Sequence, residues 1–158
     1  MYIIDGHNLL HSVKKIEEGY EAISDIELSR IIGGYLKITN QKGEIIFDGT
    51  GPRNKDVFSR IDGVEILFAG IGTDTDSVIE KKIKAHTAPK RLTIVSSDRR
   101  LRKAARTRKA TSVKSEDFWY IVQKQLSRRK PKREPAAKRQ GLSESETKQW
   151  LELFGLEQ

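Results

Sequence analysis

The chain has 158 residues, enough for one domain of ordinary size and a short appendage. It contains no cysteine, which excludes disulfides and thiolate sites, and no apolar run approaches the roughly 18 residues that a membrane-spanning helix needs. The formal net charge of +8 is concentrated in residues 99–139, which have 16 Lys and Arg against 3 Asp and Glu, whereas residues 1–98 have 13 against 15 and residues 140–158 have 1 against 4.

The first half of the chain is expected to contain two strands and one long helix. Residues 2–5 form a short apolar strand; no basic leader precedes it, so we expect a strand, not a signal peptide, and a cytoplasmic protein. Ser24 and Glu27 form a capping box, and apolar residues follow at helical spacing, so a helix is predicted from Ser24 to Gly43. Residues 44–48 (EIIFD) then predict a buried strand.

In the second half, strands continue to alternate with helices. Continuous apolar strands separated by helices indicate a parallel sheet covered on both faces, an α/β fold. The elements expected are a strand at 64–68, a helix at 74–86 with Val78, Ile79 and Ile83 inward, a strand at 92–97, a basic helix at 99–108, an edge strand at 110–113, and a helix at 115–127 that buries Phe118, Ile121, Val122 and Leu126.

Beyond these elements the composition changes. We expect a globular domain over residues 1–127 and a basic, Pro-containing disordered linker over 128–142. A second capping box at Ser143 and Glu146 opens a short amphipathic helix over 143–156. Its apolar residues Trp150, Leu151 and Phe154 are expected to pack on the domain or on a second copy in a homodimer; a partner protein's groove is the alternative.

Aspartates follow the predicted strands. Asp5, Asp48 and Asp98 end a strand or follow one directly, and Asp74 and Asp76 open the helix after the third strand. Parallel strands place their carboxyl ends at one edge of the sheet, where ligands bind. A single aspartate there is usually a turn or cap, but several together repel one another unless a cation is present.

The cation is expected to be Mg²⁺ or Mn²⁺, because the predicted cluster offers only oxygen donors. Asp76 is the preferred ligand of its pair, and Asp74 is either a helix cap or a supporting carboxylate. Asn8, placed in a loop after the first strand, either holds a metal-bound water or fixes Asp5, with an ordinary turn role as the alternative. His7 and His11 are expected to flank that turn without a catalytic role.

The basic helix after Asp98 places positive charge beside the aspartates. We expect it to guide a phosphodiester backbone toward them, assisted by Arg53 and Lys55 in the loop at 49–55; a merely solvated helix face is the alternative. Ser96 and Ser97 are expected either to contact phosphate or to cap the helix. The candidate nucleic-acid contacts are Arg53, Lys55, Ser97, Arg99, Arg100, Arg102, Lys103 and Arg106.

Four segments together resemble the NYN family of PIN-like nucleases, and most closely its YacP-like subgroup. They are IIDGHNLL at 3–10, IIFDG at 45–49, TDSVIEKKI at 75–83 and IVSSDRRLRKAA at 94–105, in the order and spacing of the family. The resemblance covers about residues 1–125 and implies a PIN-like three-layer α/β/α domain with a mainly parallel sheet. It also implies a Mg²⁺- or Mn²⁺-dependent endoribonuclease in which Asp5, Asp76 and Asp98 hold the metal and Asn8 and Asp48 assist.

The sequence leaves three functions open. The first is an endoribonuclease that acts on RNA, either free or held by an assembly such as the ribosome. The second is a non-catalytic RNA- or ribosome-binding adaptor on the same fold, and the third is a phosphatase or DNA-directed nuclease. The presence of Asp5, Asp76 and Asp98 together favours an enzyme.

Overall fold

The computed structural model describes residues 1–129, so most of the expected linker and the whole expected C-terminal helix lie outside the described residues. None of the described helices combines the length and the hydropathy that a membrane-spanning helix requires. The elements in chain order are β1 (Tyr2–Asp5), α1 (Gly6–Ile16), α2 (Asp25–Ile38), β2 (Gly43–Phe47), α3 (Asp56–Ser59), β3 (Glu65–Phe68), α4 (Thr75–Ala85), the 3₁₀ helix η1 (Pro89–Arg91), β4 (Thr93–Val95), α5 (Arg99–Thr107), β5 (Thr111–Val113) and α6 (Ser115–Arg129).

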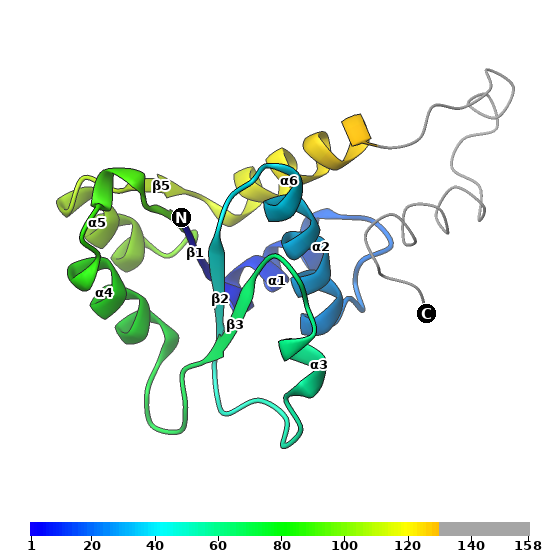
Figure 1. Cartoon of the computed structure of the whole chain (residues 1–158), viewed down its shortest axis with the longest axis horizontal. Helices are drawn as coiled ribbons and strands as arrows, with labels where there is room; N and C mark the ends of the chain where they lie inside the picture. The colour runs from blue at the N-terminus through cyan, green and yellow to red at the C-terminus, as the bar shows by residue number, and fades with distance from the viewer. Residues whose placement is uncertain (130–158) are drawn as a thin grey trace, which may run out of the picture.

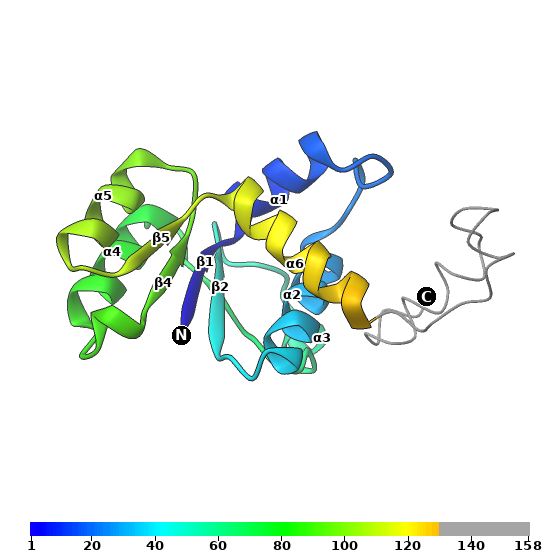
Figure 2. The same ribbon diagram turned by 90° about the horizontal axis from the view of Figure 1, so that it is seen from above.

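The five strands form one parallel sheet in the order β3-β2-β1-β4-β5. Helices α4 and α5 lie on one side of it, and α1, α2, α3 and α6 lie on the other (Figures 1 and 2). This confirms the expected three-layer α/β/α architecture and makes the described sheet wholly parallel. The loops that follow β2 and β3 lie at the same end of the molecule, at the bottom of Figure 1.

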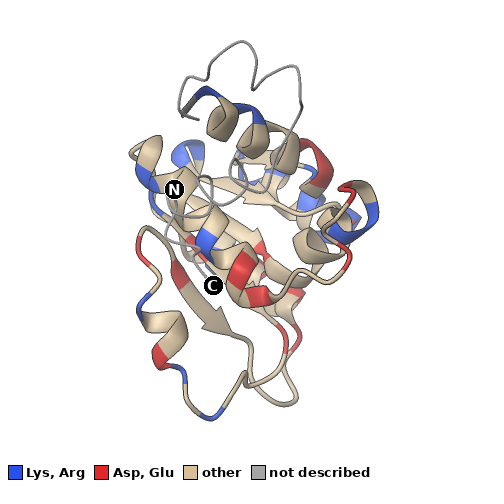
Figure 3. Cartoon of the chain, turned by 90° about the vertical axis from the view of Figure 1, so that its right-hand side faces the viewer, with Lys and Arg blue, Asp and Glu red and all other residues tan. Residues whose placement is uncertain are grey.

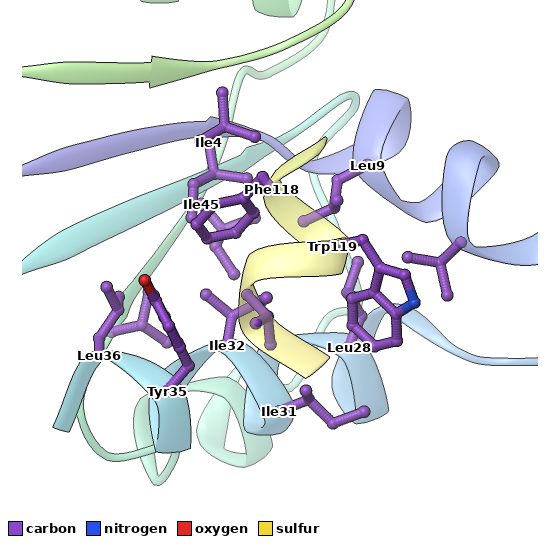
Figure 4. Packing of buried hydrophobic residues seen from close by; sticks show 14 of the residues in the cluster. Ile4, Leu9, Leu28, Ile31, Ile32, Tyr35, Leu36, Ile45, Phe118 and Trp119 are labelled. Atoms are coloured by element: carbon purple, nitrogen blue, oxygen red, sulfur yellow. The ribbon is translucent and has the colours of Figure 1, made fainter. Parts of the chain in front are cut away.

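Alternating strand residues supply two separate cores. Ile4, opposite Ile45 and Val95 in the register, faces α1, α2 and α6, where Phe118 and Trp119 fill the space between sheet and helices (Figure 4). Ile3, Ile46 and Ile94 face the other way and pack on α4 and α5. This alternation puts Asp5, two residues after Ile3, on the side of the sheet that α4 and α5 cover.

The expected loop after β1 is wrong, because helix α1 begins at Gly6. Leu9 and Val13, one turn apart, are fully buried against the sheet, and this burial stabilises the helix. Glycine is required at its first position: a Cβ on Gly6 would lie 2.5 Å from the Phe47 ring and 2.9 Å from the Ile46 carbonyl oxygen. The close approach of α1 to β2 fixes how the residues after Asp5 are arranged.

One boundary, two positions of α6 and two short helices also differ from expectation. Helix α2 ends at Ile38, not near Gly43, because Asn40 adopts a left-handed φ of 54° and the Gln41 amide donates to the Leu36 carbonyl. In α6, Ile121 is 44% exposed, whereas Trp119, which the periodicity had not placed inside, is 2% exposed. The short helices α3 and η1 were not predicted.

Candidate active site

Three aspartates lie within electrostatic range of one another beyond the carboxyl ends of the strands. Asp5 is the last residue of β1, Asp76 lies in the first turn of α4, and Asp98 is the N-cap of α5. Because α4 and α5 cover the side of the sheet that Asp5 faces, their N-termini approach its carboxylate. The positive ends of both helix dipoles therefore lie at the candidate site, where they favour negative charge.

Asp5 is nearly buried, with 6% of its surface exposed. Burial raises the pKa of Asp5, as do the charges of Asp48 and Asp98, whereas a hydrogen bond from Ser96 opposes the increase. The Ser96 hydroxyl donates to Asp5 Oδ2 over 3.0 Å and accepts from the Asp98 backbone amide over 3.1 Å. Ser96 therefore joins two of the three aspartates, whereas the helix cap that was one of its two expected roles is supplied by Asp98.

Asp76 is only partly buried, yet its pKa lies well above the ordinary value of an aspartate. Burial, followed by the charges of Asp98 and Asp5, raises the pKa of Asp76 to about 6. Asp98 also caps α5, because its Oδ1 accepts from the Arg100 amide over 2.8 Å. The charges of Asp98 and Asp5 thus both contribute to the raised pKa of Asp76.

The two other candidate aspartates have structural partners. Asp74 is the N-cap of α4, and hydrogen bonds from the backbone and hydroxyl of Ser77, at 2.6 and 3.1 Å, lower its pKa. Of its two expected roles, the helix cap is therefore the one observed. Asp48 follows β2 and accepts from both the amide and the hydroxyl of Thr75, which ties β2 to the start of α4.

An open depression of about 410 Å³ lies over these carboxylates. His7 and His11 line it from α1, one helical turn apart, so the expected turn between them is wrong. His7 Nδ1 accepts from the Asp48 amide over 3.0 Å and lies 3.3 Å from Asp48 Oδ2, so His7 ties α1 to the residue that follows β2. Asp98 is not part of the lining, which comprises Asp5, His7, Asn8, His11, Asp48, Asp74, Thr75 and Asp76.

A larger hollow of about 700 Å³ lies elsewhere, along β3 and α3. Its walls include Phe58, Ile66 and Phe68, and among the candidate residues only Lys55 reaches it. The predicted chemistry is therefore associated with the smaller depression.

Asn8 lies in the first turn of α1 and is held by residues from two other parts of the chain. Its Oδ1 accepts from the Ser97 amide over 2.9 Å and from the Ser115 hydroxyl over 2.5 Å. The Ser97 hydroxyl donates to Glu116 over 2.7 Å and accepts from the Ser115 amide over 3.1 Å. Sequence reasoning missed Ser115 and Glu116, since the start of α6 carries no local signal that it reaches Asn8.

Some basic residues near the site already contact protein groups, whereas others are exposed and have no ion pair among the described residues. Arg100 pairs with Glu80, approaches Asp74 at 3.9 Å and donates to Ser77 over 3.2 Å. Arg102 is half-buried, and Lys55 lies 5.9 Å from the centre of the Phe68 ring. The exposed cations without an ion pair among residues 1–129 include Arg53, Arg99, Lys103 and Arg106.

These cations do not form a uniform basic face. In the view of Figure 3, Lys and Arg positions (blue) are interspersed with Asp and Glu positions (red) over helices and loops. On α5 the exposed Arg99, Lys103 and Arg106 recur at i, i+4 and i+7, so they share one side of the helix, opposite the buried Leu101 and Ala105.

The donor chemistry of the cluster fits a hard divalent cation. Its carboxylate oxygens are the ligands that Mg²⁺ and Mn²⁺ prefer, and burial together with mutual repulsion raises the pKa values of Asp5 and Asp76. Among residues 1–129, however, no three acidic or His side chains are arranged as a ready metal-binding group.

Comparison with known proteins identifies the fold and the family. Crystal structures of Rae1 (YacP) from Bacillus subtilis share the fold: one aligns with a TM-score of 0.63 at 17% identity, covering 82% of this chain and 78% of that one. A mutant form of Rae1 aligns with a TM-score of 0.59 at 16% identity, covering 97% and 91%. Comparison with curated proteins gives no match. The family described as YacP-like NYN domain matches residues 2–154, and the chain belongs to this family of PIN-like nucleases.

Proposed function

We propose that the protein is a metal-dependent endoribonuclease that hydrolyses phosphodiester bonds of RNA. The observation that carries the proposal is the convergence of Asp5, Asp76 and Asp98 at the N-termini of two helices, with a raised pKa at Asp5 and at Asp76. Such a concentration of carboxylates costs stability unless a cation offsets it. Membership of a family of PIN-like nucleases supports the same reaction.

The residues have separable roles in this mechanism. Mg²⁺ or Mn²⁺ held by Asp5, Asp76 and Asp98 would lower the pKa of a bound water and neutralise charge on the reacting phosphate. Ser96 orients Asp5 and restrains the backbone of Asp98. Asp48 and Asp74 add negative charge to the depression while fixing the start of α4.

RNA is the proposed substrate because the site is combined with exposed cations. Arg99, Lys103 and Arg106 follow Asp98 along α5, and Arg53 lies in the loop after β2. Phosphate contacts of this kind give affinity without reading sequence. We therefore propose weak sequence preference by this chain, with the choice of RNA set by a larger assembly such as the ribosome.

The direct test compares labelled RNA and DNA of the same sequence, incubated with the full chain and Mn²⁺ or Mg²⁺, with and without EDTA. We expect cleavage of RNA that EDTA abolishes and that Asp76→Asn reduces by at least about a hundredfold. The matched control is Asp62→Asn. Asp62 is an exposed aspartate that pairs with Lys37, and it lies just before the amino end of β3, away from the carboxyl ends of the strands.

Three results would contradict the proposal. Cleavage that persists in EDTA or in Asp76→Asn would exclude the metal mechanism. RNA binding without cleavage, both for free RNA and for ribosome-bound RNA, would instead support the adaptor function. Preferential cleavage of DNA would assign the same site to a DNA-directed nuclease.

A further inference from the structure

The side-chain amide of Asn8 has a fixed orientation. A backbone N–H can only donate, so the Asn8 atom that faces the Ser97 amide must be the carbonyl oxygen, Oδ1. The Ser115 hydroxyl donates to the same oxygen, and together the two donors occupy both of its lone pairs. Oδ1 is therefore not free to bind a metal ion.

The nitrogen of the same side-chain amide, Nδ2, can still donate hydrogen bonds. Asn8 Nδ2 donates to no group among residues 1–129, and Asn8 lines the depression that contains Asp5 and Asp76. The Asn8 backbone amide also lowers the pKa of Asp5, opposing the larger effect of burial, so the two residues are close together. A pair of N–H donors in such a place favours an anionic oxygen.

Ser115 is suited to hold this orientation. It is fully buried at the first position of α6, and its two polar groups join α1 to the segment between β4 and α5. Rotation of the Asn8 amide by half a turn would bring Nδ2 against the Ser97 N–H and leave the Ser115 hydroxyl without its acceptor. Buried polar groups left unpaired cost free energy, so the network opposes that rotation.

We propose that Asn8 is a hydrogen-bond donor to a non-bridging phosphate oxygen of the RNA and that Ser115 is the positioning residue that orients its amide. The inference rests on the proposed RNA substrate and assigns Asn8 to substrate binding instead of metal binding. Asp5, Asp76 and Asp98 keep their proposed metal role.

The test measures binding of a fluorescein-labelled single-stranded RNA to the full chain by anisotropy, in EDTA so that the RNA is not cleaved. Asn8→Asp keeps the acceptor for Ser97 and Ser115 but replaces the donor with a negative charge, and we expect it to weaken binding by about tenfold or more. We expect Asn8→Ala to reduce the affinity for RNA somewhat less than Asn8→Asp does, and Ser115→Ala to reduce it about threefold. Asn40→Asp, at the other edge of the sheet, and Ser127→Ala, exposed on α6, are the matched controls.

The double variant distinguishes positioning from general destabilisation. If Ser115 acts through Asn8, Ser115→Ala in the Asn8→Ala background causes no further loss of affinity. Additive losses, RNA affinity of Asn8→Asp equal to that of the unaltered protein, or no RNA binding at all would overturn the inference. Thermal unfolding of each variant establishes that it is folded at the assay temperature.

This outcome is separable from that of the nuclease test. Non-additive binding losses in a protein that cleaves no RNA would support the role of Asn8 and refute the endoribonuclease. Metal-dependent cleavage combined with additive losses would refute the role of Asn8 alone.

Discussion

Asp76 and Asp98 lie at the N-termini of neighbouring helices and interact through their carboxylates. Partial burial, followed by the charge of Asp98, raises the pKa of Asp76 to about 6, from an ordinary value of 3.8. Both helices pack on the side of the sheet that Asp5 faces, so Asp5, the last residue of β1, lies beside the other two aspartates.

Asp76→Asn is expected to stabilise the metal-free protein at neutral pH. Between pH 3.8 and about 6 the folded protein binds the Asp76 proton more tightly than the unfolded chain does. The contribution of Asp76 to the free energy of unfolding is therefore fully present below pH 3.8 and is lost as the pH rises through about 6. The full shift corresponds to about 3 kcal/mol, which the exposure of Asp76 to solvent reduces to about 1 kcal/mol.

The measurement is thermal unfolding in EDTA across a pH series. The amide that Asp76→Asn introduces cannot ionise, so the variant should have the higher Tm at about pH 7.5 and should approach the unaltered protein near about pH 3.5. An equal difference in Tm at both pH values would show that ionisation of Asp76 is not the cause.

Divalent cations should stabilise the folded protein, so that the unaltered protein has a higher Tm than Asp76→Asn when the cation is present. A ligand that binds only the folded state at a hundred times its Kd adds about 2.7 kcal/mol to the free energy of unfolding. We expect Mn²⁺ to raise the Tm of the unaltered protein and of Asp62→Asn, but not that of Asp5→Asn or Asp76→Asn. Differential scanning fluorimetry over a Mn²⁺ titration measures this, and an equal increase for Asp76→Asn would place the cation elsewhere.

Ser96→Ala should destabilise the protein by about 1–3 kcal/mol, because it removes a buried hydroxyl that joins Asp5 and Asp98. The loss of its hydrogen bond should also raise the Asp5 pKa further, since that bond opposes the effect of burial. Urea unfolding gives the change in free energy, with the exposed Ser127→Ala as control. Equal midpoints for the two variants would contradict the bridging role.

The cations of α5 should contribute unequally to RNA binding. Arg99, Lys103 and Arg106 are exposed on one side of the helix, whereas Arg100 pairs with Glu80. Each phosphate contact on a single strand contributes about 0.7 to the slope of log K against log salt. Alanine at 99, 103 and 106 together should reduce the slope by up to about 2, and Arg100→Ala or the exposed Lys15→Ala of α1 much less. Equal slopes for all variants would exclude α5 from the interface.

Local patterns predicted most of the elements, because strand periodicity, capping boxes and apolar spacing act over short distances. Ser24 caps α2 as predicted, with its hydroxyl accepting from the Glu27 amide over 3.1 Å. Helix α1 was missed because the segment Gly6–Ile16 begins with glycine and carries two histidines, and only burial of Leu9 and Val13 on the sheet explains its helical form. Trp119 shows the same dependence on tertiary packing.

The sequence by itself determined that aspartates stand at the ends of parallel strands and at the starts of the following helices, because that depends on local signals and on the strand direction rule. Only the tertiary structure decided which of them interact. Strand alternation turned Asp5 toward α4 and α5, and helix capping occupied Asp74, while Asp76 and Asp98 were brought into range of Asp5. Likewise, Asn8 met Ser115 only because α6 returns across α1, and a contact over such a distance along the chain leaves no local pattern to read.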